Sequence, residues 1–285
     1  MAESTSLKKR LQAGEFMVLP GVFDALTARI VQGVGFKAAY MTGFGVAASH
    51  GYPDFGLLTM SDMLAVLTRI CNAVDIPIIA DADTGYGNPV NVYHTVKQYE
   101  KAGAQGIQLE DQTWPKRCGH MAGKQVIEAE EMVDKIAAAV DARENEETLL
   151  VIRTDAIATH GFEEAIRRAE LYADAGADVL FVEAPDPEQM VRIPSLLAKP
   201  CLLNAAMPDP NMTAGRIKEM GYALAIFPGV TLLGVVEGAY QLSRLLNEEG
   251  RFALAKGMRF NFDEFNHLMN IDTYMRLDKK FSNHQ

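Results

Sequence analysis

The stretch YEKAGAQGIQLE, from Tyr99 to Glu110, contains a predicted helix end, a turn of small residues and an aliphatic strand that finishes in glutamate. The same order returns in YADAGADVLFVE, from Tyr172 to Glu183. Chains in which each helix leads through a short turn into the next strand form α/β folds with a parallel sheet. The two stretches therefore predict that helices and parallel strands alternate along this chain.

Short β-branched or aliphatic runs occur eight times along the chain, beginning at Phe16, Phe36, Ile76, Gly106, Leu149, Val179, Cys201 and Ala223. Segments with helical spacing and little glycine or proline separate these runs. Because eight such strand and helix units close most naturally into a ring, we predict an α/β fold of the (β/α)8 TIM-barrel type. We expect one domain over residues 1–285, in which residues 250–285 form a C-terminal helical extension.

Composition and charge narrow the class of protein. The chain has 285 residues, of which 48% are hydrophobic, enough to fill a large core. A net charge of -10 disfavours nucleic acid or an anionic membrane as a partner. No stretch reaches the roughly 20 apolar residues that a membrane span needs. Three widely scattered cysteines make a poor disulfide framework, so we expect a reducing compartment, the cytoplasm.

The polar residues that break the apolar strand pattern lie at the carboxyl ends of the predicted strands. They are Asp81, Asp83, Glu110, Asp111, Arg153, Asp155, Glu183 and Asn204. In a barrel these ends converge on the one face where active sites are found. The pattern therefore predicts a polar site at this face.

The acidic members of this set suggest a metal site. Asp81 and Asp83 are two residues apart and on a strand would point to the same side. Glu110, and Asp54 in the loop after the second predicted strand, could join them. Together these residues offer carboxylate oxygens, which suit Mg²⁺ or Mn²⁺ rather than zinc. The structural alternatives are an Asx turn at Asp83 and a helix cap at Glu110.

The sequence KRCGH, from Lys116 to His120, lies in a long loop after strand four, Thr113 to about Glu128. Long loops on the catalytic face of a barrel are usually lids. The cations that flank Cys118 would lower the pKa of its thiol. The alternative is that the charged residues only solvate a loop. A zinc site is a weaker interpretation, since one cysteine and one histidine lack the other ligands.

These motifs resemble the isocitrate lyase and phosphoenolpyruvate mutase superfamily, in particular its 2-methylisocitrate lyase, 2,3-dimethylmalate lyase and petal-death-protein members. The resemblance covers Leu11 to Phe281 and rests on YMTGFGVAASHGYPDFGLLT, PIIADADTGYGN, IQLEDQTWPKRCGH, IRTDA and FVEAP. It implies a homotetramer whose C-terminal helices pack on or swap with a neighbouring subunit. It also implies a small 2-hydroxy or 2-oxo dicarboxylate as substrate.

The resemblance further implies roles for individual residues. The metal Mg²⁺ is held by Asp81 and Asp83, with Asp54 and Glu110 acting mainly through water. Residues implied to contact the substrate are Thr42, Gly43, Phe44, Gly119, Arg153, Glu183 and Asn204. Catalytic roles are implied for the loop residues Lys116, Arg117, Cys118 and His120, with the thiol of Cys118 as general acid.

The implied activity is cleavage of a substituted malate to a 2-oxo acid, pyruvate or similar, and a carboxylic acid. Hydrolysis or decarboxylation of oxaloacetate, or cleavage of a phosphorus–carbon bond in a phosphonopyruvate-type substrate, stays open as the alternative. Two departures from the tricarboxylate-using relatives bear on the substrate. This chain reads NAAMPDPNMT from Asn204, where those relatives place a glutamate, and it has no Lys or Arg from Ala223 to Ser243. We therefore expect a smaller or less charged substrate than 2-methylisocitrate.

Overall fold

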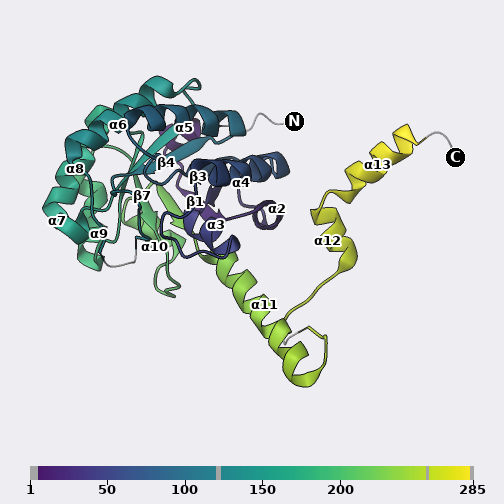
Figure 1. Ribbon diagram of the computed structural model, residues 1–285. Coiled ribbons are helices and arrows are strands. Elements are labelled where there is room, and N and C mark those ends of the chain that lie inside the picture. The colour runs from purple at the N-terminus through teal and green to yellow at the C-terminus, as the bar shows by residue number, and fades with distance from the viewer. Residues whose placement is uncertain (1–5, 120–122, 255–256, 283–285) are drawn as a thin grey trace.

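Eight parallel strands close into a barrel surrounded by helices (Figure 1). The computed structural model describes residues 6–119, 123–254 and 257–282. The strands are β1 (Met17–Val22), β2 (Ala39–Met41), β3 (Ile78–Asp81), β4 (Gly106–Glu110), β5 (Leu149–Thr154), β6 (Val179–Val182), β7 (Cys201–Asn204) and β8 (Leu224–Phe227). Each pairs with its sequence neighbours, and β1 closes the ring by pairing with β8. The predicted TIM-type fold is confirmed.

Helices lie outside the ring between successive strands. They are α2 (Ala25–Val34), α3 (Gly43–Ser49), α4 (Met60–Ala73), α5 (Pro89–Ala102), α6 (Ala129–Ala142), α7 (Ile157–His160), α8 (Phe162–Ala175), α9 (Pro187–Leu196) and α10 (Ala214–Glu219). A short helix, α1 (Leu7–Gln12), precedes β1, and α11 (Val230–Glu249), α12 (Phe262–Leu268) and α13 (Ile271–Phe281) follow β8.

The two repeated stretches that predicted the fold form the same helix end. Gly103 after α5 and Gly176 after α8 adopt left-handed backbone conformations, with φ of 102° and 118°. Glycine adopts this conformation without steric cost. It ends a helix because the N–H groups that follow can then donate to carbonyls of the last helical turn. The tyrosine that opens each stretch, Tyr99 or Tyr172, is fully buried, and its carbonyl accepts the N–H of the alanine after the glycine.

Side chains fill the inside of the barrel in layers. The interior is apolar toward the amino ends of the strands, where Met17, Leu19, Ile79, Leu149, Val151, Val179, Phe181, Leu202 and Leu224 pack together. Leu7 of α1, fully buried, belongs to the same cluster. Because side chains alternate along a strand, the next inward positions on five strands are Asp81, Glu110, Arg153, Glu183 and Asn204. The polar site is thus the layer of the barrel interior at the carboxyl ends of the strands.

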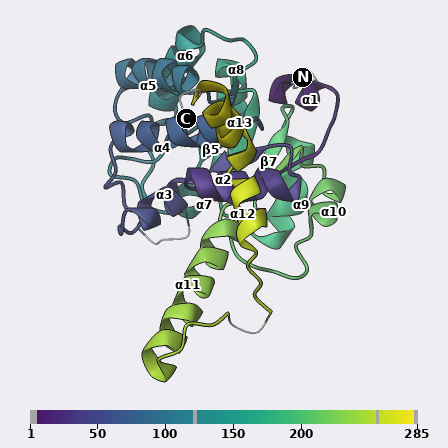
Figure 2. The same ribbon diagram turned by 90° about the vertical axis from the view of Figure 1, so that its right-hand side faces the viewer.

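The helix after β8, α11, contacts the barrel at its first turn, where the Thr231 hydroxyl donates to the Gly21 carbonyl at 2.7 Å, but most of its length does not cover the barrel wall (Figure 1). α11 runs away from the barrel, and α12 returns to lie beside α2 (Figures 1 and 2). The Arg29 guanidinium of α2 donates to the carbonyl of Leu268 at 3.2 Å. An apolar groove stays open between α2 and α11, lined by Val18, Pro20, Ile30, Val31, Val34, Phe36, Val230 and Val235. Within the described part of the chain, no helix combines the length and apolarity needed to cross a membrane.

Closure of the barrel between β1 and β8 requires glycine at position 21. A Cβ added at Gly21 would lie 2.2 Å from the backbone carbonyl oxygen of Pro228. Gly21→Ala is therefore expected to lower the free energy of unfolding by about 3 kcal/mol or more, because neither backbone can move aside cheaply. Urea unfolding measures this difference.

Gly215→Ala in α10 is the matched control, because the nearest atom to its added Cβ is 3.9 Å away. It should leave stability unchanged or raise it by up to about 1 kcal/mol, since alanine is the better helix former. Equal stability of Gly21→Ala and the wild type would contradict the closure described here.

Candidate active site

A cavity of about 210 Å³ opens at the carboxyl end of the barrel. Strand ends and two loops supply its polar lining: Tyr40, Thr42, Asp54, Asp81, Lys116, Cys118, Gly119, Arg153, Glu183 and Asn204. Its other wall is apolar and consists of Phe44, Ala206, Met207, Ile226, Pro228 and Gly229. Residues predicted from three separate motifs thus meet around one space.

Asp81 is held rigidly at the end of β3. Its Oδ1 accepts the N–H of Asp83 at 3.0 Å and the Gln108 amide at 3.2 Å. Its Oδ2 accepts the N–H of Gly43 at 3.1 Å. The N–H of Gly43, a residue implied to contact the substrate, is therefore already used by this carboxylate. Glycine is required at 43 because an added Cβ would lie 2.7 Å from Asp81 Oδ2.

Asp83 reaches the site by a different route from the one predicted. The strand ends at Asp81, and Asp83 follows in a left-handed turn with φ of 48°. The turn, rather than strand alternation, brings its carboxylate beside that of Asp81. No helix begins at Glu110, so the alternative role of this residue as a helix cap is wrong.

Lys116 from the KRCGH loop is buried among the carboxylates. Its ammonium lies 2.5 Å from Asp54 Oδ1 and 2.8 Å from Asp83 Oδ1. Burial disfavours the charged ammonium, but Asp83 and Asp54 outweigh that effect and raise the pKa of Lys116 well above its usual value. Lys116 is therefore a permanent cation in the site.

Burial makes the charged form of Asp83 less favourable. Burial raises its pKa to about 6; Lys116 opposes this rise, whereas the nearby charges of Asp81 and Asp54 add to it. Asp83 Oδ1 faces the Lys116 ammonium at 2.8 Å. A cluster of this kind holds more negative charge than one lysine compensates.

These residues fit a hard divalent cation. Asp81 and Asp83 offer buried carboxylate oxygens close together, and with Asp54 they outnumber the one ammonium of Lys116 beside them. Within the described ranges, no three Asp, Glu, His or Cys side chains converge closely enough to hold a metal by themselves. Mg²⁺ suits such a site, because it usually keeps several waters and takes only one or two protein carboxylates.

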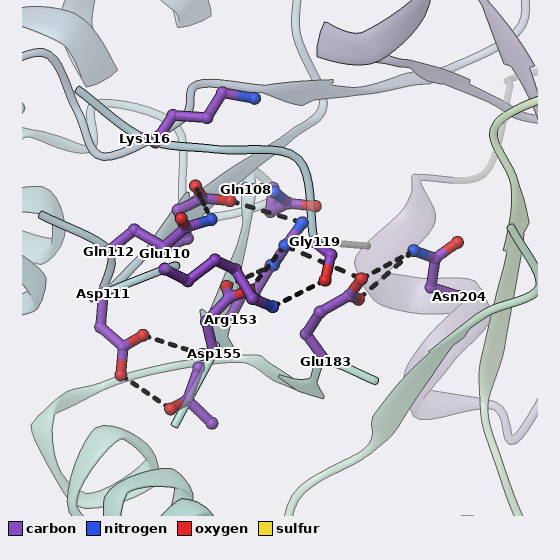
Figure 3. A network of polar contacts seen from close by, with 12 residues as sticks. Gln108, Glu110, Asp111, Gln112, Lys116, Gly119, Arg153, Asp155, Glu183 and Asn204 are labelled. Atoms are coloured by element: carbon purple, nitrogen blue, oxygen red, sulfur yellow. Dashed lines mark hydrogen bonds and ion pairs between the residues drawn. The ribbon is translucent and has the colours of Figure 1, made fainter. Parts of the chain in front are cut away.

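The far side of the site is a network around Arg153 (Figure 3). Its guanidinium makes two hydrogen bonds to Asp155, at 2.8 and 2.9 Å, and lies 3.4 Å from Glu110 Oε2 and 3.8 Å from Glu183 Oε1. Burial raises the pKa of Glu110, against the effect of Arg153. Asn204 donates to Glu183 at 3.3 Å, and its own Oδ1 is buried with no partner among the described residues.

Residues 116–119 lie over this network. The N–H of Cys118 donates to the carbonyl of Asp54 at 3.1 Å, and the Cys118 side chain lines the cavity. A Cβ added at Gly119 would lie 2.1 Å from Glu183 Oε1, so this position also needs glycine. Arg117 is not among the residues that line the cavity, and its guanidinium stacks over the Phe55 ring, 5.0 Å from the centroid. His120 lies outside the described residues.

The site agrees with what the chain resembles. A family model described as phosphoenolpyruvate phosphomutase matches residues 7–242. The 2,3-dimethylmalate lyase of Eubacterium barkeri is 40% identical over 286 residues, which cover 99% of both chains. The solved structure of oxaloacetate acetylhydrolase with 3,3-difluorooxalacetate superposes with a TM-score of 0.91 at 35% identity, covering 96% of this chain and 95% of that one.

A third similar protein is phosphonopyruvate hydrolase, solved in complex with oxalate and Mg²⁺. It gives a TM-score of 0.90 at 28% identity and covers 99% of this chain and 100% of that one. The chain belongs to the phosphoenolpyruvate mutase and isocitrate lyase superfamily. The resemblance expected from the sequence is confirmed, and the protein is an enzyme whose relatives support the class of carbon–carbon lyases.

Sequence reasoning missed two residues in the site of this superfamily member. Tyr40 donates its hydroxyl to Gln108 at 2.7 Å, and Gln108 in turn holds Asp81. Gln108 could have been found, because it interrupts the aliphatic run GIQLE at an inward position. Asp111 was grouped with the site but points away from it, toward Tyr172 of α8, whose hydroxyl donates to it at 2.8 Å.

The three cysteines should differ sharply in reactivity. Burial raises the pKa of Cys71 to about 11 and that of Cys201 to about 12. Since the thiolate is the nucleophile, both should be inert toward iodoacetamide near pH 7, whereas Cys118 faces a solvent-reachable cavity. Mass spectrometry of the folded protein should find alkylation at Cys118 alone, and none in Cys118→Ser. Labelling of Cys71 or Cys201 at the rate of Cys118 would contradict the burial described here.

Proposed function

We propose that this protein is a Mg²⁺-dependent carbon–carbon lyase that cleaves a substituted malate-type 2-hydroxy acid. The products are a 2-oxo acid, such as pyruvate, and a carboxylic acid. The observation that carries this proposal is that one cavity brings together the carboxylate of Asp81, the cation of Arg153 and the thiol of Cys118. Mg²⁺ or a similar ion, held by Asp81 and Asp83, would lower the pKa of the substrate hydroxyl.

The side chains around the cavity supply the remaining requirements of the reaction. A carboxylate of the acidic cluster would accept the hydroxyl proton, and the resulting alkoxide would become the carbonyl of the 2-oxo acid as the adjacent carbon–carbon bond breaks. The electron pair of that bond would leave with the second fragment, which departs as an enolate-like carboxylate. Cys118, which lines the cavity, would donate its thiol proton to the carbon of that fragment. Arg153 supplies positive charge near the substrate carboxylates, and Asn204 Oδ1 is left to accept an O–H group.

The cavity also supports a choice of substrate. Ala206, Met207, Ile226 and Pro228 give its second wall an apolar surface. A third carboxylate placed there would lose its hydration without gaining a counter-charge. The wall favours a dicarboxylate with small alkyl substituents over a tricarboxylate such as 2-methylisocitrate. The name of the Eubacterium barkeri relative agrees with a substrate of this size.

Assembly and location follow from the same proposal. We propose a cytoplasmic homotetramer, in which a neighbouring subunit covers the open apolar groove between α2 and α11. Val34 and Val235 in that groove are 72% and 46% exposed, which is costly on a free surface of this extent. The three cysteines are all unpaired, as expected in a reducing compartment.

The proposed function is tested with a substrate panel. We would incubate the protein and Mg²⁺ with 2,3-dimethylmalate, citramalate, 2-methylisocitrate, oxaloacetate and phosphonopyruvate, and identify products by proton and phosphorus NMR. We expect a 2-oxo acid and a carboxylic acid from a substituted malate. EDTA should abolish turnover, and Cys118→Ser should lower it by about 100-fold or more, since general acid catalysis contributes 10²–10⁴-fold.

Other products would move the protein to another branch of the superfamily. Turnover of oxaloacetate or phosphonopyruvate alone, undiminished in Cys118→Ser, would contradict the lyase assignment. Such a result would favour the hydrolase activities named for the structurally similar proteins.

A further inference from the structure

Lys124 is a buried cation that joins the KRCGH loop to the barrel. Its side chain is 2% exposed, and its ammonium donates to two acceptors at 2.7 Å. One acceptor is the backbone carbonyl of Gly119, and the other is Oδ1 of Asp155. Neither the proposed metal site nor the proposed acid chemistry uses this lysine.

The barrel end of this contact is rigid. Asp155 is fully buried, and both of its carboxylate oxygens accept hydrogen bonds from Arg153. The N–H of Asp155 donates to Asp111 at 2.9 Å, which fixes the backbone as well. Lys124 therefore binds to a carboxylate that already sets the position of the Arg153 side chain in the cavity.

The loop end of the contact is next to the thiol. Cys118 is fixed on its amino side by its N–H, which donates to Asp54 at 3.1 Å. On its carboxyl side, the carbonyl of Gly119 is held by Lys124. Gly119 itself lies so close to Glu183 and Arg153 that a Cβ there would be 2.1 and 2.6 Å from their polar atoms. Contacts on both sides of Cys118 thus hold this part of the loop against Arg153 and Glu183.

We propose that Lys124 is a positioning residue that sets the location of the Cys118 thiol. A buried ammonium needs its acceptors, and a hydrogen bond to a charged group is stronger than one between neutral groups. Any shift of Gly119 away from Glu183 takes its carbonyl away from the ammonium. Lys124 therefore opposes such a shift and keeps the thiol facing the cavity.

The test compares Lys124→Met with the wild type, with Lys124→Arg as the conservative variant. Lys97→Met serves as a matched control, because Lys97 on α5 forms an exposed ion pair with Glu144, which follows α6. The first measurement is the rate of Cys118 alkylation by iodoacetamide in the full-length protein. The second is kcat and KM on the substrate found with the panel above.

We expect Lys124→Met to alkylate at Cys118 about tenfold faster or more, because losing a hydrogen bond to a charged group shifts the loop equilibrium by that order. Its kcat should fall by a similar factor with a smaller change in KM, and Lys124→Arg should recover much of both. Lys97→Met should behave as wild type. A variant with a lower melting temperature but unchanged alkylation and kcat would show a purely structural role and overturn the proposal.

Two provisions keep the result interpretable. If Lys124→Met does not fold, Lys124→Gln replaces it, since the amide retains an N–H donor for Gly119 but not the charge. Its alkylation rate at Cys118 should exceed that of the wild type, and a rate equal to wild type would overturn the proposal. The kinetic measurement rests on the proposed function, but the alkylation rate does not, so failure of one is distinguishable from failure of the other.

Discussion

The ion pairs of Lys116 with Asp54 and Asp83 connect the three chain segments on which the site depends. They join the loop after β2, the turn after β3 and the KRCGH loop after β4. Removing one partner of a buried pair costs about 3–5 kcal/mol, because the other charge is left without compensation. The turn that carries Asp83 and the loop that carries Cys118 are therefore not independent parts. A substitution in either one is expected to disturb the other.

The barrel tolerates this charge because its apolar and its charged side chains lie in separate layers. Apolar side chains near the amino ends of the strands, such as Leu19, Val151 and Phe181, are nearly or fully buried and stabilise the ring. One layer above, inward positions carry acids, an arginine and an amide whose charges partly balance one another. Arg153 stands among three carboxylates, those of Asp155, Glu110 and Glu183. Stability and chemistry are thus assigned to different ends of the same strands.

The sequence predicted the parts of the molecule that follow from local pattern. The helix ends at Gly103 and Gly176 and the alternation of strand residues determine the fold, and both are visible in one chain. The site face could be located because Asp81, Glu110 and Arg153 interrupt aliphatic runs at strand ends. The turn at Asp83 and the stacking of Arg117 on Phe55 depend on contacts between distant segments, which no local pattern encodes. Lys124 gives no signal in a loop of mixed charge.

The central claim is that Asp81 and its neighbours form a divalent-cation site, and calorimetric titration with Mg²⁺ tests it most directly. We would compare the wild type with Asp81→Asn and with Asp178→Asn, a carboxylate paired with Lys8 and Arg143. We predict that the wild type and Asp178→Asn bind Mg²⁺ and that Asp81→Asn does not, while all three remain folded by circular dichroism. Equal Mg²⁺ affinity in Asp81→Asn and the wild type would contradict the account.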